Sequence, residues 1–448
     1  MYIWNGFSPP PDIMKLPITD SALASVLKQM DILEISSATI RQSGAIARAL
    51  EQTTSVEFLH LEMGIPGLPP TRVGIEAEKK ALDAGVASEY PNMYGIPSLK
   101  KQSSRFLKAF LDIDVDPLGC IPTVGSMQGS FSTFLLCAHL EPQKDTILFI
   151  DPGFPVQRTQ ARILGIKSDS FDIYDYRGSR LREKLESKLC KGNVAALIYS
   201  SPNNPAWFNL TEEELQIIGE LATKYDTIVI EDLAYMCMDF RKPLGKPYEP
   251  PFQPTVAKYT DNYIIMMSGS KMFSYAGQRI AIIAISDHLF KREYPLLKDW
   301  YKMSRLGDAF VFAVLYAVSS GASHSAQYAL AEMLGAAADG ELDFVTAAAE
   351  YARRASVTKK IFLDNGFHIV YDMDGDEPVS DGFFYTVGYK DMTGGELMGE
   401  LIRYGIATIS LSTTGSRQAG VRICVSQLNR PEQFDMLEER LRLFAQNH

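Results

Sequence analysis

Hydrophobic and polar positions follow two alternating patterns through the middle of the chain. Short, almost wholly apolar runs predict buried strands, and they cover residues 146–151, 194–200, 227–231, 263–267 and 279–285. The segments between them have helical spacing. The clearest helix spans 211–225, where Thr211 takes the N-cap position and Glu214 follows three residues later. Strands that alternate with helices predict an α/β fold with a mostly parallel sheet flanked by helices.

The regions on either side of this core have a different pattern. Residues 21–51 and 326–365 read as mainly helical, and a Gly/Pro-rich crossing covers 61–70. Shorter strands and two further helices follow, at 367–371, 382–388, 407–411 and 421–425, at 396–404, and after Pro431. We therefore predict a large domain over 61–324 and a smaller α+β domain that combines 1–60 with 325–448.

Composition excludes several classes of protein. The chain has 448 residues, 46% of them hydrophobic, and a formal net charge of −10. An acidic chain offers no field that attracts nucleic acid or anionic membranes. No apolar run is long enough to span a bilayer, and the N-terminus lacks a secretory pattern. Five scattered cysteines and six histidines show no metal-ligand spacing. We expect a cytoplasmic protein with no metal, nucleic-acid or membrane partner.

Three of the predicted strands end in unusual polar groups. The strand at 194–200 leads into Ser201-Pro202-Asn203-Asn204, the next ends in Glu231-Asp232-Leu233-Ala234-Tyr235, and 263–267 leads into Ser268-Gly269-Ser270-Lys271. Carboxyl ends of parallel strands meet at one edge of the sheet, where ligands bind. A helix that begins within 123–129 adds small residues, whose free backbone N–H groups can bind an anion.

These groups match the requirements of pyridoxal 5'-phosphate (PLP). Its aldehyde needs a lysine, Lys271, and its pyridinium nitrogen needs a carboxylate, Asp232, with Glu231 as the alternative on the other side of the strand. Tyr235 and Asn204 can reach the ring hydroxyl, and Phe154 can lie against the ring. The remaining candidate cofactor-binding residues are Gly125, Ser126, Met127, Ser268, Ser270 and Arg279.

From about Leu61 to Val425 these motifs, in this order, resemble the class I/II aminotransferases of PLP fold type I, the aspartate aminotransferase-like enzymes. The resemblance implies transfer of an amino group between an L-amino acid and a 2-oxo acid through a lysine-bound PLP imine. It implies Lys271, Asp232 and Tyr235 as catalytic residues. Aspartate is the default substrate.

The same resemblance implies residues that spacing alone does not single out. Gly64, Asn204 and Arg422 match substrate-binding positions, with the Arg422 guanidinium on the substrate α-carboxylate. Tyr90 matches the tyrosine that reaches the cofactor phosphate of a partner subunit, with Tyr94 as a rival. A homodimer with shared active sites is therefore implied.

The chain departs from the family pattern in three places. Asn204-Pro205-Ala206-Trp207 replaces Asn-Pro-Thr-Gly, so a tight-turn glycine is missing. Phe154 stands where tyrosine or tryptophan is frequent, and Gly64-Ile65-Pro66-Gly67-Leu68 replaces Gly-x-Pro-Asp-Phe. These changes bear on substrate choice more than on cofactor binding.

Two rival functions share part of this pattern. A PLP-dependent carbon–sulfur β-lyase, or a related synthase, would use the same residues, because the reactions diverge after a common carbanionic stage. A non-catalytic PLP-binding sensor is the more remote alternative. Such regulators carry a DNA-binding domain ahead of the core, and the residues before the core here contain no basic helix pair.

Overall fold

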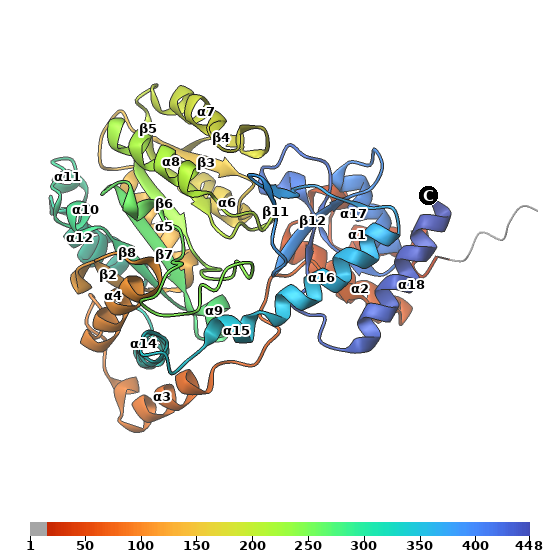
Figure 1. The fold of residues 1–448 in the computed structure, drawn as a ribbon, viewed down its shortest axis with the longest axis horizontal. Coiled ribbons are helices and arrows are strands. Elements are labelled where there is room, and N and C mark those ends of the chain that lie inside the picture. Colours follow the sequence, from red (N-terminus) through yellow and green to blue (C-terminus); the bar gives the residue numbers. More distant parts are fainter. Residues whose placement is uncertain (1–15) are drawn as a thin grey trace, which may run out of the picture.

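The computed structural model describes residues 16–448, which form two lobes around separate sheets (Figure 1). The large-sheet lobe comprises the elements from α3 to α14. Its seven strands lie in the order β2-β8-β7-β6-β5-β3-β4, and β8 runs antiparallel to both of its neighbours. The strands are β2 (Cys120–Val124), β3 (Thr146–Asp151), β4 (Lys167–Asp172), β5 (Val194–Ser200), β6 (Ile228–Asp232), β7 (Tyr263–Ser268) and β8 (Ile280–Ile285).

Helices cover this sheet on both faces. Helix α5 packs against β8, with the π-helix Ala309–Leu315 behind it, and α14 packs against α3 and α4. The helices of the lobe are α3 (Arg72–Asp83), α4 (Pro97–Leu111), α5 (Gly125–Cys137), α6 (Pro155–Ile163), α7 (Arg180–Leu189), α8 (Glu212–Lys224), α9 (Gly269–Met272), α10 (Asp287–Lys291), α11 (Leu297–Tyr301), α12 (Leu306–Asp308), α13 (Tyr316–Ser319) and α14 (His324–Ala338).

The small-sheet lobe comprises α1, α2, β1 and the elements from α16 to the C-terminus, and α15 (Phe344–Ala348) leads into it. Its main sheet has the order β14-β15-β12-β9, and β1 pairs in parallel with β13. Its helices are α1 (Asp20–Gln29), α2 (Ile40–Thr54), α16 (Glu350–Asp364), α17 (Gly394–Arg403) and α18 (Pro431–Asn447). Its strands are β1 (Leu59–His60), β9 (His368–Ile369), β10 (Met373–Asp374), β11 (Glu377–Pro378), β12 (Phe384–Gly388), β13 (Ile406–Ala407), β14 (Ile409–Ser410) and β15 (Val421–Cys424).

The predicted core elements are confirmed to within one residue at each end. The helix predicted at 211–225 is α8, and Thr211 and Glu214 form the reciprocal capping hydrogen bonds. The stretch 326–365 is mainly helical as predicted, and turns divide it into α14, α15 and α16. The domain limits remain a prediction. Residues 1–15, which belong to the predicted small domain, lie outside the described part of the chain. Packing of α14 on α3 and α4 favours placing that helix with the large sheet.

Two buried carboxylates, one from each lobe, accept hydrogen bonds from the opposite lobe. Asp172, at the end of β4, accepts hydrogen bonds from the Tyr371 hydroxyl at 2.8 Å and the Arg417 N–H at 2.7 Å. Asp374, in the β10–β11 hairpin, accepts from Arg241 at 2.9 Å and Arg177 at 3.4 Å. Each lobe therefore supplies one carboxylate that accepts hydrogen bonds from donors of the other lobe. These bonds fix the separation of the two lobes along this edge.

Replacing Asp374 by Asn tests this link. The neutral amide gives up the charge-assisted bonds to Arg177 and Arg241, so the free energy of unfolding should fall by about 2 kcal/mol. The measurement is urea unfolding followed by circular dichroism. Asp376→Asn, on the exposed turn of the same hairpin, is the matched control and should change stability by less than about 0.5 kcal/mol. Equal losses in the two variants would contradict a specific role for Asp374.

Candidate active site

The carboxyl edge of the large sheet faces the small-sheet lobe and carries Lys271. The Ser268 side chain accepts a hydrogen bond from the Ser270 N–H at 3.1 Å, which starts the short helix α9 directly after β7. Lys271 lies on this helix, and its Nζ donates to the Gly64 carbonyl oxygen. Gly64 has no room for a side chain, because a Cβ there would lie 2.7 Å from the Phe384 ring. The lysine and the crossing segment are thus in direct contact.

Electrostatics favour the neutral form of Lys271. Burial, with a smaller contribution from the positive charges of Arg422 and Arg279, lowers the pKa of its amine to about 8. A lysine with its ordinary pKa would be almost wholly protonated near neutral pH. The surroundings therefore provide a useful fraction of free amine, the form that attacks an aldehyde or accepts a proton.

Asp232 is the last residue of β6, and its side chain is buried. One oxygen accepts a hydrogen bond from Gln157 Nε2 at 2.9 Å, and the other accepts from the Ala234 N–H at 3.2 Å. Burial raises the pKa of Asp232 to about 6. Glu231 is engaged on the opposite face, where it accepts from Tyr199 at 2.9 Å. The geometry favours Asp232 as the acid available at this edge.

Gln157 is a site residue that the sequence analysis missed. It lies on α6 three residues after Phe154, about one helical turn from the residue expected against the cofactor ring. Phe154 itself is half-buried at the N-cap of that helix. A pattern of i and i+3 positions at the start of α6 is the signal that could have identified Gln157.

An anion cradle forms where α5 begins. Gly125 has φ +66°, and a Cβ there would lie 2.3 Å from the Arg279 guanidinium, so the arginine rests against the helix N-terminus. Arg279 also donates to the Ser270 hydroxyl at 3.5 Å. Ser126 occupies the first turn of α5, and the Met127 carbonyl accepts from Gln160 Nε2 at 2.8 Å. Backbone N–H groups and a guanidinium converge as a phosphate requires.

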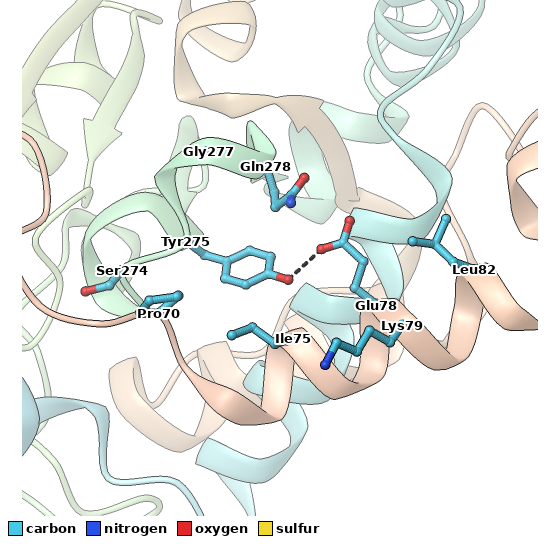
Figure 2. A pocket seen from close by; sticks show the side chains of 9 residues that line it. All are labelled: Pro70, Ile75, Glu78, Lys79, Leu82, Ser274, Tyr275, Gly277 and Gln278. Carbon is cyan, nitrogen blue, oxygen red and sulfur yellow. Dashed lines mark hydrogen bonds between the residues drawn. The ribbon is translucent and has the colours of Figure 1, made fainter.

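The loop between Lys271 and Arg279 is tied to helix α3. Figure 2 shows the Tyr275 ring directed at Glu78, and its hydroxyl donates to that buried carboxylate. Glu78 also accepts from the Ser325 hydroxyl at 3.0 Å. Lys271 and Arg279 therefore lie at the two ends of a loop that is anchored at its centre.

Arg422 is the buried cation of the small-sheet lobe, with 1% of its surface exposed. It donates to Asn204 Oδ1 at 2.9 Å and to the Glu62 carbonyl oxygen, and its guanidinium lies 4.5 Å from the Phe384 ring centre. Its Nε is buried with no hydrogen-bond partner among the described residues. An unpaired buried N–H beside two paired ones is a fitting site for an anionic ligand group.

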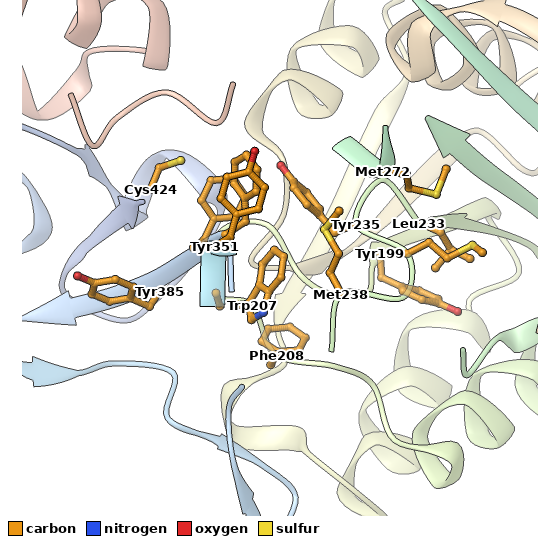
Figure 3. Packing of buried hydrophobic residues seen from close by; sticks show 14 of the residues in the cluster. Tyr199, Trp207, Phe208, Leu233, Tyr235, Met238, Met272, Tyr351, Tyr385 and Cys424 are labelled. Carbon is orange, nitrogen blue, oxygen red and sulfur yellow. The ribbon is translucent and has the colours of Figure 1, made fainter. Parts of the chain in front are cut away.

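Tyr235 is held in a cluster of aromatic rings between the lobes (Figure 3). The centres of the Trp207, Phe383 and Phe384 rings lie 5.2–5.4 Å from that of Tyr235. Burial raises the pKa of the Tyr235 hydroxyl well above its ordinary value, so it is a donor at all physiological pH values.

The two candidate tyrosines for a partner subunit differ in exposure. Tyr90 is 89% exposed, whereas Tyr94 donates its hydroxyl to Asp308 at 3.0 Å and packs on Phe312. Tyr94 is thus engaged within its own chain, and Tyr90 is available to another one.

Two other kinds of site find no support in residues 16–448. No group of histidine, cysteine, aspartate and glutamate side chains there is arranged to hold a metal ion. None of the helices described combines the length and the apolar character that crossing a bilayer requires.

Comparison with known proteins identifies the family. Residues 57–441 match the sequence pattern of aminotransferase class I and II, so the chain belongs to that family. It is 29% identical to a probable aspartate aminotransferase of Methanocaldococcus jannaschii over 58% of this chain and 64% of the relative. It is 24% identical to human kynurenine–oxoglutarate transaminase 1 over 52% and 57%. The matched span thus covers less than two thirds of each of these relatives.

The solved structures agree in fold. Aspartate aminotransferase from Thermus thermophilus with maleate superposes with a TM-score of 0.71, at 19% identity, over 92% of this chain and 97% of the other. The α/β fold predicted from sequence, that of PLP fold type I, is confirmed.

The described residues fit PLP, the cofactor on which this family depends. Asp232 is a buried carboxylate that would suit the ring nitrogen, and Lys271 is a partly buried amine of lowered pKa that would suit the aldehyde. The glycine-started helix α5 and Arg279 form a cradle for the phosphate. All of these groups lie at one edge of the sheet, where a single small molecule can contact them together.

The lowered pKa of Lys271 predicts how PLP binding depends on pH. Only the neutral amine attacks, so the rate of cofactor capture by the cofactor-free protein should rise tenfold per pH unit up to about 8 and then level off. The growth of visible absorbance after mixing measures this rate. A rate that keeps rising towards the ordinary lysine value of 10.5 would contradict the inferred environment. Lys271→Ala is the control, and should show no such phase.

Proposed function

We propose that this protein is a PLP-dependent aminotransferase that moves an amino group between an L-amino acid and a 2-oxo acid. The observation that carries the proposal is the meeting of Lys271, Asp232 and Arg422 at one edge of the large sheet, in a chain that belongs to the aminotransferase class I and II family. When bound, PLP withdraws electron density from the substrate α-carbon.

The protein groups then have distinct tasks. Arg422 binds the substrate α-carboxylate, and its bond to Asn204 fixes the plane of the guanidinium. Lys271, once free, takes the proton from the substrate α-carbon as a general base, which its lowered pKa favours. Asp232 holds a proton on the ring nitrogen, and Gln157 keeps that carboxylate in place.

Aspartate is the default substrate, supported by relatives named aspartate aminotransferase at 24–29% identity. Arg72, Arg305 and Arg417 are the candidates for reading a second carboxylate. Arg72 is paired with Glu76, and Arg305 with Asp308. A cytoplasmic location belongs to the same proposal.

The absorbance of purified protein tests the function directly. Single amino acids are added to the PLP-loaded protein without any oxo acid. Loss of the visible band with release of one equivalent of the matching 2-oxo acid is expected, and Lys271→Ala should reduce turnover by at least about 10⁴-fold. Release of pyruvate and ammonia instead would identify the β-lyase. A variant without Lys271 that transaminates at the wild-type rate would refute the assignment.

We further propose a homodimer in which Tyr90 reaches the phosphate site of its partner. Mixing Tyr90→Phe and Lys271→Ala protomers tests this arrangement. A mixed dimer then contains one site with both an intact lysine and an intact tyrosine from the other chain. Activity and cofactor retention should therefore exceed those of either parent variant. If Tyr90 serves its own chain, no complete site forms, and mixing should restore nothing.

A further inference from the structure

Trp207 combines features that a residue chosen for stability alone would avoid. It is fully buried, it adopts a left-handed backbone conformation with φ 68°, and its Nε1 has no hydrogen-bond partner among the described residues. A bulky side chain at positive φ is strained, and a buried unpaired N–H loses its hydration. The family has glycine at this place in the motif. Costs of this kind concentrate at functional sites.

The indole crosses from one lobe to the other (Figure 3). Trp207 follows β5 of the large-sheet lobe. It fits against Gly382 of the small-sheet lobe, which lies two residues before β12 (Phe384–Gly388). A Cβ on Gly382 would lie 2.0 Å from the indole, so this glycine leaves the space that the tryptophan fills. The two residues form a matched pair across the lobe interface.

Trp207 contacts the groups that shape the site. Its ring lies edge-on to Tyr235 at 5.2 Å and to Phe384 at 6.0 Å, and Phe384 supports the Arg422 guanidinium from 4.5 Å. The backbone links Trp207 to Asn204 as well, because the Trp207 N–H donates to the Asn203 carbonyl at 2.9 Å and closes the turn. Any shift of the indole would displace both ends of the Arg422–Asn204 contact.

We infer that Trp207 is a positioning residue that holds Tyr235 against the cofactor ring hydroxyl and keeps Arg422 and Asn204 aligned for the substrate carboxylate. The inference rests on the proposed aminotransferase function and deepens it. Trp207 touches neither substrate nor cofactor in this scheme. It acts through its neighbours, and its packed side chain restricts a turn that a glycine would leave flexible.

The first test compares Trp207→Gly and Trp207→Phe with Tyr235→Phe. Trp207→Gly should raise KM for the amino donor at least tenfold with a smaller fall in kcat, since it loosens carboxylate binding. It should also shift the pH titration of the visible absorbance in the same direction as Tyr235→Phe, whereas Trp207→Phe should keep most of both properties. Adding Trp207→Gly to Tyr235→Phe should move the titration no further. An unchanged titration and a KM within twofold of wild type would overturn the inference.

The second test uses the matched pair of Trp207 and Gly382. Gly382→Ala should push the indole away and reproduce the raised KM, and the double variant Trp207→Gly/Gly382→Ala should be no worse than Trp207→Gly alone. Fully additive losses would overturn the pairing. Trp300→Phe, which removes an exposed tryptophan, is the control and should leave KM within twofold of wild type.

A third measurement does not depend on activity. In cofactor-free protein, Trp207→Gly should increase amide hydrogen exchange in peptides that contain Tyr235 and Phe384 at least tenfold, and leave α18 unchanged. Unchanged exchange at both places would overturn the inference even in an active enzyme. Failure of the proposed function is recognised separately, as wild-type protein that transaminates no donor, and the exchange and absorbance measurements still decide the role of Trp207.

Discussion

The burial of Arg422 and Lys271 in one place is the constraint on which the rest of the structure depends. Two cations removed from water need hydrogen-bond acceptors close by. Here the acceptors are two backbone carbonyl oxygens and one side-chain amide oxygen. Glu62 and Gly64 provide the carbonyls, and Asn204 provides the amide. None of these is a carboxylate that would neutralise the charge. The hydrogen bonds of Arg422 and Lys271 therefore leave their charges without a directly bonded carboxylate.

This constraint explains why the segment around Gly64 crosses between the lobes. The crossing brings carbonyl oxygens to both cations at once, and Gly64 allows the approach because Phe384 occupies the space of a side chain. Asp172 and Asp374 then fix the far edge of the interface with hydrogen bonds that run in both directions. The two lobes are thus held together by contacts at the site and by contacts away from it. Both sets of contacts determine the geometry of the site.

Much of the fold and of the candidate site could be predicted from sequence, because the reactive side chains lie at the ends of the strands. Asp232 directly follows one apolar run, and Lys271 follows another after three small residues. Their position at the edge of the sheet can therefore be predicted from the pattern alone. The strands β2 and β4 were missed for a physical reason. Both lie at the sheet edges, where Pro122 is tolerated in β2 and where β4 exposes Lys167 and Ser168, so neither reads as a buried run. Gln157 and Glu78 act through contacts between distant segments, which periodicity does not encode.

The loop after β5 shows how a departure from a family pattern should be interpreted. Loss of a turn glycine alone would suggest a rearranged loop, yet the turn is retained, with Trp207 in the left-handed conformation that glycine would adopt. The compensation lies 175 positions away, at Gly382, where the absence of a side chain admits the indole. Gly382 permits close packing of the indole, and Trp207 contacts the Phe383 and Phe384 rings across the lobe interface.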